Sequence, residues 1–251
     1  MKESGYHIAI ADVAAMELGD LLALEAKPDK PNYFNLDHML DLIERFISPL
    51  TPFWPGRTEI KNRGDIHPRR NKEWQLITRM QWRAYLNGFR ARNFYAQKIH
   101  LDGKEEEVGA IMNRTAEMKV AERKMWIDQI ERAKVLSQMT YEEQIRRVQT
   151  WVTMLHPQIK NVHRRLDLRI HRIVHMSNRA HGGGRIAKND ALDNHLDFSH
   201  FYPVVVITND QPYIKSCIDS GSRQAVNILT TDQMVNEWRK NQEIRLKWSS
   251  A

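Results

Sequence analysis

Apolar residues recur every three or four positions along most of the chain, and this spacing predicts a mainly helical protein. Helices are expected over residues 36–48, 73–97, 105–138, 141–155 and 159–177. Thr140 with Glu143, and Thr230 with Gln233, each match the capping-box pattern that marks the first residues of a helix. Pro157 is expected to separate the fourth predicted helix from the fifth.

Strand patterns occur near both ends of the chain. Residues 6–10 form a short apolar stretch, and 204–208 is a β-branched run between turn residues, which is typical of a buried central strand. Residues 226–229 predict another short strand. Because helices are expected between and after these strands, the order indicates an α/β fold. Residues 49–72 are rich in proline and glycine and predict a long loop.

Positive charge is concentrated in the middle of the chain. The 251 residues carry a formal net charge of +7, and between Tyr141 and Arg185 nine lysines and arginines face three acids. A basic helix over 159–179 suits a nucleic acid, although a solvated helix face has the same composition. The candidate nucleic-acid contacts are Arg164, Arg165, Arg169, Arg172, Arg179 and Arg185.

The only cysteine is Cys217, so neither an internal disulfide nor a cysteine-rich zinc site is expected, and a reducing cytoplasm is the expected location. No apolar run approaches the roughly 18 residues of a membrane span, and the first residues lack the apolar stretch of a signal peptide. We therefore expect no membrane partner, while a homo-oligomer or a protein partner stays open.

Carboxylates stand at positions where catalysis can use them. Asp210 follows the predicted strand 204–208, Asp190 and Asp193 lie one turn apart on a predicted helix, and Glu17 lies early in the helix after the first strand. Clustered carboxylates repel one another unless a cation neutralises them, and Mg²⁺ or Mn²⁺ prefers such oxygen ligands. Alternatively, Asp190 caps a helix, Asp193 is a surface acid and Asp210 belongs to a turn.

These motifs resemble the PIN-like ribonuclease domains. The segment 189–193 resembles the family's acid-bearing helix, and 204–210, which ends in Thr208-Asn209-Asp210, resembles its apolar strand ending in Thr-x-Asp. Residues 6–18 look like the family's second strand and helix, in which Glu17 matches a metal-ligating glutamate. The match covers residues 6–24 and 186–238, which is under a third of the chain.

The resemblance implies a metal-dependent endoribonuclease in which Glu17, Asp190 or Asp193, and Asp210 are catalytic and hold Mg²⁺ or Mn²⁺. It also implies a discontinuous α/β core with a parallel sheet, made of residues 6–35 and 186–238, and a basic, helical insertion at 36–185 that presents cations to RNA more readily than to DNA. The family's first strand, which ends in a metal-binding aspartate, is not found before Tyr6. A degraded nuclease that binds RNA or DNA without cutting it is therefore the alternative, and a helical interaction scaffold is a third.

His171 and His175 are four residues apart and share one face of the predicted basic helix. They can hold a metal ion or a phosphate, or they can simply add to a basic binding face. The absence of a glutamate between them excludes a metalloprotease motif. The basic face is the preferred interpretation.

Overall fold

The computed structural model describes residues 6–11, 14, 36–56, 60, 66–90, 98–101, 104–107, 117, 120–121, 123–132, 135–184, 193 and 195–248. In this part the chain is mostly helical and contains three two-stranded sheets, two of them parallel. Contacts divide the chain into unit 1, Met1–Gly56 with Ile66–Val120, and unit 2, Arg57–Asp65 with Ala121–Ala251. Among the described residues, no helix has the length and apolar character that a bilayer crossing requires.

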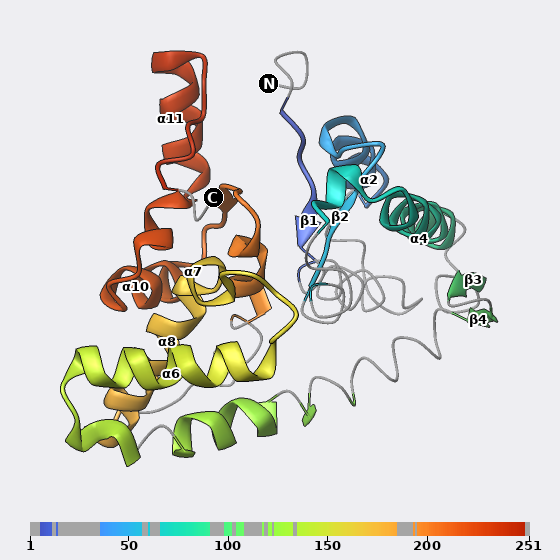
Figure 1. The fold of residues 1–251 in the computed structure, drawn as a ribbon. Coiled ribbons are helices and arrows are strands. Elements are labelled where there is room, and N and C mark those ends of the chain that lie inside the picture. The colour runs from blue at the N-terminus through green and yellow to red at the C-terminus, as the bar shows by residue number, and fades with distance from the viewer. Residues whose placement is uncertain are drawn as a thin grey trace, which may run out of the picture. The chain divides into compact units, whose positions relative to one another are not determined.

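A short parallel sheet begins unit 1 (Figure 1). Strand β1 (Ile10–Ala11) pairs with β2 (Phe53–Trp54), and helix α2 (Leu36–Phe46) lies between them in the chain. An isolated parallel bridge from Ile8 to Ile47 extends this pairing. The strand predicted at 6–10 is therefore present only in part, as Ile10 of β1 and the bridge at Ile8, and the partner of β1 lies inside the segment that was predicted to be a loop.

Helix α4 (Lys72–Arg90) supplies much of the apolar packing in unit 1. It follows a turn of 3₁₀ helix, η2 (Pro68–Arg70), and Asn71 accepts a hydrogen bond from the backbone N–H of Trp74 at 3.0 Å. The indole N–H of Trp74 donates to the carbonyl of Phe53 at 3.2 Å, and the Phe53 ring meets Trp82 edge to face. The helix thereby packs against β2.

Two expectations for unit 1 were wrong. Residues 49–72 are not one loop, because they contain β2 and η2. The long helix predicted over 105–138 does not begin there, because β4 (Lys104–Glu107) pairs with β3 (Lys98–Leu101) as an antiparallel hairpin. Helical residues appear at 123–132, in unit 2, followed by η4 (Val135–Gln138). Lysine and glutamate favour helices locally, so the strand is set by its antiparallel pairing with β3.

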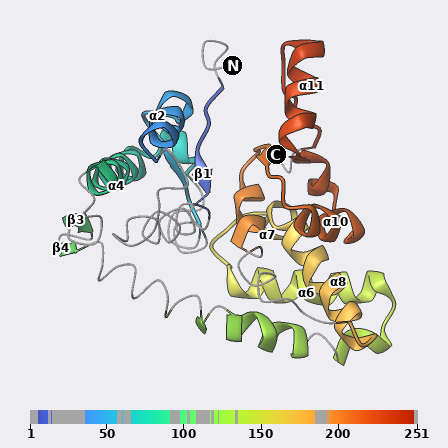
Figure 2. The ribbon, with the colours of Figure 1, turned by 180° about the vertical axis from the view of Figure 1, so that it is seen from behind.

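Three helices form the base of unit 2: α6 (Tyr141–Leu155), α7 (Val162–Arg165) and α8 (Asp167–His181). The capping box of Thr140 and Glu143 starts α6 as predicted, and α6 ends before Pro157. The single basic helix predicted over 159–177 is divided at Leu166 into α7 and α8. Helix α8 packs against α6 on one side and against α10 (Gln211–Asp219) on the other (Figures 1 and 2).

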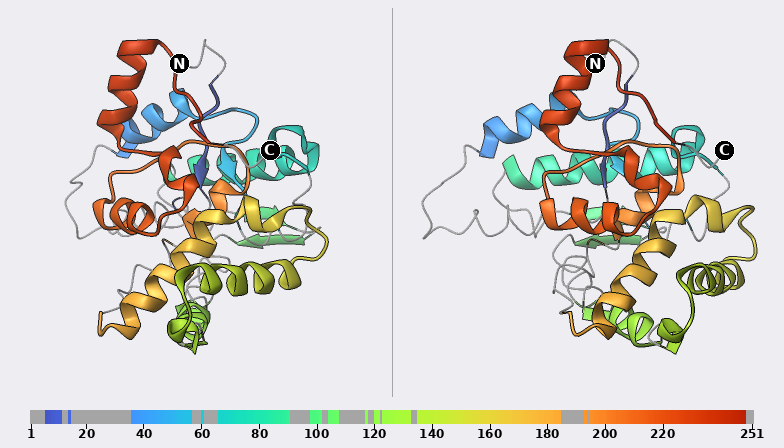
Figure 3. Two further views of the ribbon diagram at one scale, coloured as in Figure 1. Left: turned by 60° about the vertical axis from the view of Figure 1, so that its left-hand side comes forward. Right: turned by 90° about the vertical axis from the view of Figure 1, so that its left-hand side faces the viewer.

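The C-terminal part of unit 2 is a strand–helix–strand arrangement. After the 3₁₀ helix η5 (Asp197–Phe201), strand β5 (Val206–Ile207) is joined through α10 and η6 (Arg223–Asn227) to β6 (Ile228–Leu229), which pairs with it in parallel. The predicted capping box of Thr230 and Gln233 then starts α11 (Thr231–Asn241). From two further sides, Figure 3 shows α11 and α6 at opposite ends of unit 2.

The strand predicted at 204–208 is shorter and more exposed than a buried central strand. It has two residues, Val206 is only partly buried, and Ile207 is 42% exposed. Apolar packing is instead centred on Leu168, Tyr213, Cys217, Ala225 and Ile228. The prediction of a predominantly helical protein is confirmed, and in place of one parallel-sheet core the described residues contain two small parallel sheets. The joining of 6–35 with 186–238 into a PIN-like core stays a prediction, and β1 belongs to unit 1 while β5 and β6 belong to unit 2.

Candidate nucleic-acid interface

The arginines predicted to contact nucleic acid do not share one surface. Arg164 and Arg179 are exposed, and Arg165 is half-buried with its guanidinium 4.8 Å from the centre of the Phe201 ring. Arg169 and Arg172 are buried in unit 2. Arg185 lies outside the described residues. The predicted basic stripe is therefore split between solvent and the protein interior.

Arg172 forms an ion pair inside unit 2. Its Nη1 donates to Oδ1 of Asp197 at 2.7 Å, and both side chains are fully buried. Burial lowers the pKa of Arg172, but the facing Asp197 outweighs this effect and the net shift is upward. Burial raises the pKa of Asp197, and Arg172 and Arg169 oppose that rise. Arg172 is thus a charged interior group and is not available to a phosphate.

Polar and aromatic groups of α10 surround this pair. The hydroxyl of Tyr213 donates to the same Asp197 oxygen at 3.2 Å, and its ring lies 4.8 Å from the Arg172 guanidinium. Within the described residues, Nη2 of Arg172 and Oδ2 of Asp197 have no hydrogen-bond partner. Cys217 is buried beside them, and burial raises the pKa of its thiol to about 12. The cysteine therefore stays protonated and is not a nucleophile.

Arg169 is held by aromatic rings and an amide. Its guanidinium lies 4.4 Å from the centre of the Phe198 ring and 5.9 Å from that of Trp126. It also donates to the side-chain oxygen of Gln129 at 3.3 Å. Cation–π contacts of this kind stabilise a desolvated arginine by about 2 kcal/mol. Arg169 therefore joins α8 to η5 and to the helical residues before η4.

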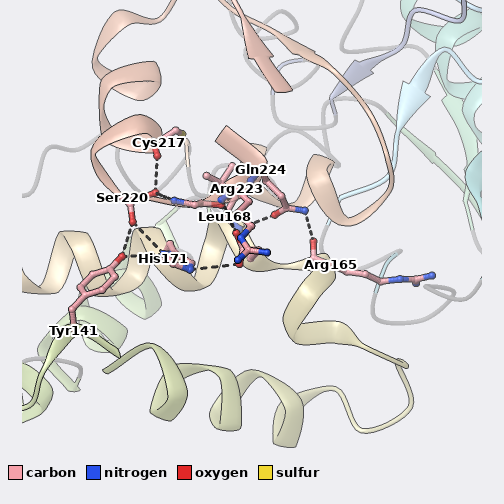
Figure 4. Close-up of polar contacts among 10 residues, drawn as sticks. Tyr141, Arg165, Leu168, His171, Cys217, Ser220, Arg223 and Gln224 are labelled. Carbon is pink, nitrogen blue, oxygen red and sulfur yellow. Dashed lines mark hydrogen bonds and ion pairs between the residues drawn. The ribbon is translucent and has the colours of Figure 1, made fainter. Parts of the chain in front are cut away.

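Gln224 links α7, α8 and η5 (Figure 4). Its side-chain N–H groups donate to the carbonyls of Arg165 at 3.0 Å and His200 at 2.8 Å, and its side-chain oxygen accepts from the backbone N–H of Leu168 at 2.7 Å. These bonds serve backbone groups at the α7–α8 junction that the helices leave unpaired. Gln224 thereby helps to set the direction of α7 relative to α8.

A second polar cluster fixes the first turn of α6 (Figure 4). The Tyr141 hydroxyl donates to the carbonyl of Ser220 at 2.6 Å, and Nδ1 of His171 lies 3.0 Å from that hydroxyl. Nε2 of His171 faces Oδ1 of Asp167 at 3.5 Å, while Oδ2 of Asp167 accepts from the Ser222 hydroxyl at 2.6 Å. Both imidazole nitrogens face protein groups, so His171 connects α6, α8 and the turn after α10.

Helix α6 and the segment after it carry an exposed group of cations. Four side chains, which we call the α6–α7 basic surface, are exposed: Arg146, Arg147, Lys160 and Arg164. Helix α7 packs directly on α6. The buried face of α6 is formed by Gln144, Ile145, Val148 and Val152. Because the arginines of α6 lie off this face, their charge is directed to solvent.

The structure gives Asp210 the role of a helix N-cap. Its Oδ1 accepts from the backbone N–H of Tyr213 at 2.9 Å, and its own N–H donates to the Thr208 hydroxyl at 3.2 Å. Asn209 accepts from the backbone N–H of Thr231 at 3.0 Å and so joins the carboxyl ends of β5 and β6. Aspartate is a favoured N-cap residue, so Asp210 has a structural role in starting α10.

The other predicted acidic ligands are only partly described. Asp193 is half-buried, and its carbonyl accepts from Arg172 at 3.4 Å. Glu17 and Asp190 lie outside the described residues. Within the described part of the chain, no three acids, histidines or cysteines are grouped as metal ligands. The described residues alone therefore do not form the expected Mg²⁺ or Mn²⁺ ligand set, and the metal site stays a prediction.

Sequence patterns contain a signal for the burial of Arg172 that charge counting overlooks. Arg172 lies four residues from Leu168 and from Met176, which are both buried on α8, and so it occupies an apolar position of the helix. Its partner Asp197 is 25 residues away and is not visible to local patterns.

No family model, curated protein or solved structure matches the chain.

Proposed function

We propose that unit 2 binds nucleic acid, RNA in preference to DNA, through the α6–α7 basic surface. The observation that carries this proposal is the exposure of Arg146, Arg147, Lys160 and Arg164 on two helices that pack together and on the turn between them. A nucleic acid that contacts such a surface releases counterions, which makes binding favourable and dependent on salt. The chain's net charge of +7 acts in the same direction.

The internal contacts of unit 2 support this assignment because they keep α6 and α7 in place. Tyr141 ties the first turn of α6 to Ser220, and Gln224 ties the end of α7 to η5. Cations on a fixed backbone lose less conformational entropy when they bind phosphates than cations on a loop do. The buried arginines of α8 thus contribute to binding only by holding the fold.

Fluorescence anisotropy of a labelled single-stranded RNA across a salt series tests the proposal. The double variant Arg146→Ala/Arg147→Ala is expected to weaken binding and to reduce the slope of log K against log salt by about 1.4, which is two phosphate contacts on a single strand. The pair Arg239→Ala/Lys240→Ala on α11 is the matched control, since both side chains are exposed and adjacent. An unchanged slope in the first variant, or an equal loss in both, would contradict the proposal.

A second candidate function is metal-dependent endoribonuclease activity of the PIN-like kind. The observation that favours it is the parallel pair β5 and β6, which is joined through α10 and has Asp210 just beyond the carboxyl end of β5. In open α/β sheets, ligands bind at this edge. Bound Mg²⁺ or Mn²⁺ would activate water there, with Asp193 or Asp190 and Glu17 as further ligands.

Asp210→Asn separates catalysis from folding, because asparagine caps helices about as well as aspartate. If the chain is a nuclease, single-stranded RNA is cut with Mg²⁺ or Mn²⁺, EDTA stops the cleavage, and Asp210→Asn abolishes it while the melting temperature is retained. Asp219→Asn, at the other end of α10, is the control and is expected to cut normally. Cleavage that persists in EDTA would rule out the metal mechanism.

A further inference from the structure

An apolar ridge is exposed on α6 directly beside its arginines. Met154 is 72% exposed, Leu155 67% and Trp151 36%. Arg147, Trp151 and Leu155 follow one another at intervals of four residues, so they form one row along the helix, and Met154 lies next to Trp151 at an interval of three. The ridge borders the buried face of α6, because Trp151 and Leu155 each lie three residues after a buried valine, Val148 and Val152.

We infer that this ridge is a stacking platform for the bases of a single-stranded nucleic acid, with Trp151 as the main contact. The inference rests on the proposed binding function and names the form of nucleic acid that the surface selects. Trp151 supplies an aromatic ring that is partly exposed, the kind of side chain on which bases stack, and Arg147, four residues earlier, can pair with the phosphate that follows the stacked base. A duplex keeps its base faces stacked internally and cannot use the ridge.

The charge beside the ridge favours a single-stranded nucleic acid over a second copy of the chain as the ligand of the ridge. A symmetric contact through the ridge would bury Arg147, which lies in the ridge row, and removing a charged side chain from water is unfavourable unless an anion pairs with it. A polyanion pairs with Arg147, and its bases supply the apolar surface that the ridge needs. The experiment must therefore also be able to reveal binding of a protein partner or of a second copy to the ridge.

The test compares binding of the full chain to a labelled 12-residue oligouridylate and to a blunt-ended RNA duplex, which has no unpaired bases. Trp151→Ala is expected to weaken binding of the single strand about tenfold to hundredfold and to leave duplex binding within about twofold. Trp151→Phe, which keeps an aromatic face, is expected to retain most of the affinity. Ile218→Ala, at another exposed apolar side chain of unit 2, is the control and should bind as the wild type does.

The outcomes distinguish failure of the stacking inference from failure of the proposed nucleic-acid binding on which it rests. If the wild type shows no salt-dependent binding to either RNA, the proposed function fails. If the wild type binds but Trp151→Ala binds both RNAs unchanged, only the stacking inference fails. Sedimentation of Trp151→Ala that reveals a lost dimer would assign the ridge to contacts between copies. Met154→Ser, at the most exposed ridge position, removes apolar surface without adding charge, and it is expected to weaken single-strand binding if the ridge is the platform.

Discussion

Helices α6 and α8 are both 15 residues long and pack against each other, yet two arginines on each have opposite surroundings. Arg146 and Arg147 on α6 are exposed, whereas Arg169 and Arg172 on α8 are buried. The buried pair is supported by an acid, an amide and aromatic rings from other segments. A high density of arginine thus indicates charge in the sequence but does not tell whether that charge is used for binding or for folding.

The largest expected effect concerns the interior arginine. Arg172→Met removes the partner of Asp197 and leaves a buried carboxylate with only Tyr213 as its donor among the described residues. We expect the free energy of unfolding to fall by about 3–5 kcal/mol, measured by urea denaturation. Replacing both partners, as Arg172→Met/Asp197→Leu, should recover part of this loss, because no unpaired charge remains. A loss below about 1 kcal/mol in the single variant would show that the pair is not the support we describe.

A smaller loss of stability is expected when the pH is lowered. This loss tests whether the interior of unit 2 tolerates a charged histidine that has no partner among the described residues. His200 is buried, and burial lowers its pKa to about 4 from an unfolded value near 6.5. The unfolded chain therefore takes up a proton before the folded one does. The contribution of His200 to the free energy of unfolding is fully present above about pH 6.5 and falls by about 3 kcal/mol as the pH drops toward 4.

Unfolding free energies measured between pH 4 and 7 check this dependence. His175, His67 and His7 also have lowered pKa values, all with burial as the first cause, and they add to the slope. His200→Phe isolates the contribution of His200, since phenylalanine does not titrate. If the variant keeps the full slope of the wild type, His200 is not its source.

The smallest change in stability is expected for the exposed arginines of α6. Arg147→Met changes the same residue type as Arg172→Met, at a position that faces solvent. Its unfolding free energy should stay within about 0.5 kcal/mol of the wild type, while RNA binding weakens. A destabilisation close to that of Arg172→Met would remove the distinction between the two helices.

Local sequence patterns predicted the parts of the fold whose causes are local. The capping boxes at Thr140 and Thr230 start α6 and α11, because each needs only residues within one turn. The hairpin of β3 and β4 was missed, since Lys104–Glu107 has helical composition and becomes a strand through its pairing with Lys98–Leu101.

The candidate site was less predictable because its geometry depends on distant residues. The burial of Arg172 depends on Asp197, and the α7–α8 junction depends on Gln224, which lies 56 residues beyond Leu168. Charge counting selected the segment 159–179, which forms α7 and α8, whereas the exposure of the α6 arginines is seen only once the packing is known. The roles of Glu17 and Asp190 stay predictions, since neither is among the described residues.

The buried thiol of Cys217 has a practical consequence. It is the only cysteine in the chain, it is fully shielded from solvent, and its raised pKa keeps it in the unreactive protonated form. A thiol reagent can therefore modify the native protein only after an opening of the structure exposes Cys217. The rate of modification measures how often unit 2 opens around this one sulfur atom, by local fluctuation or by global unfolding.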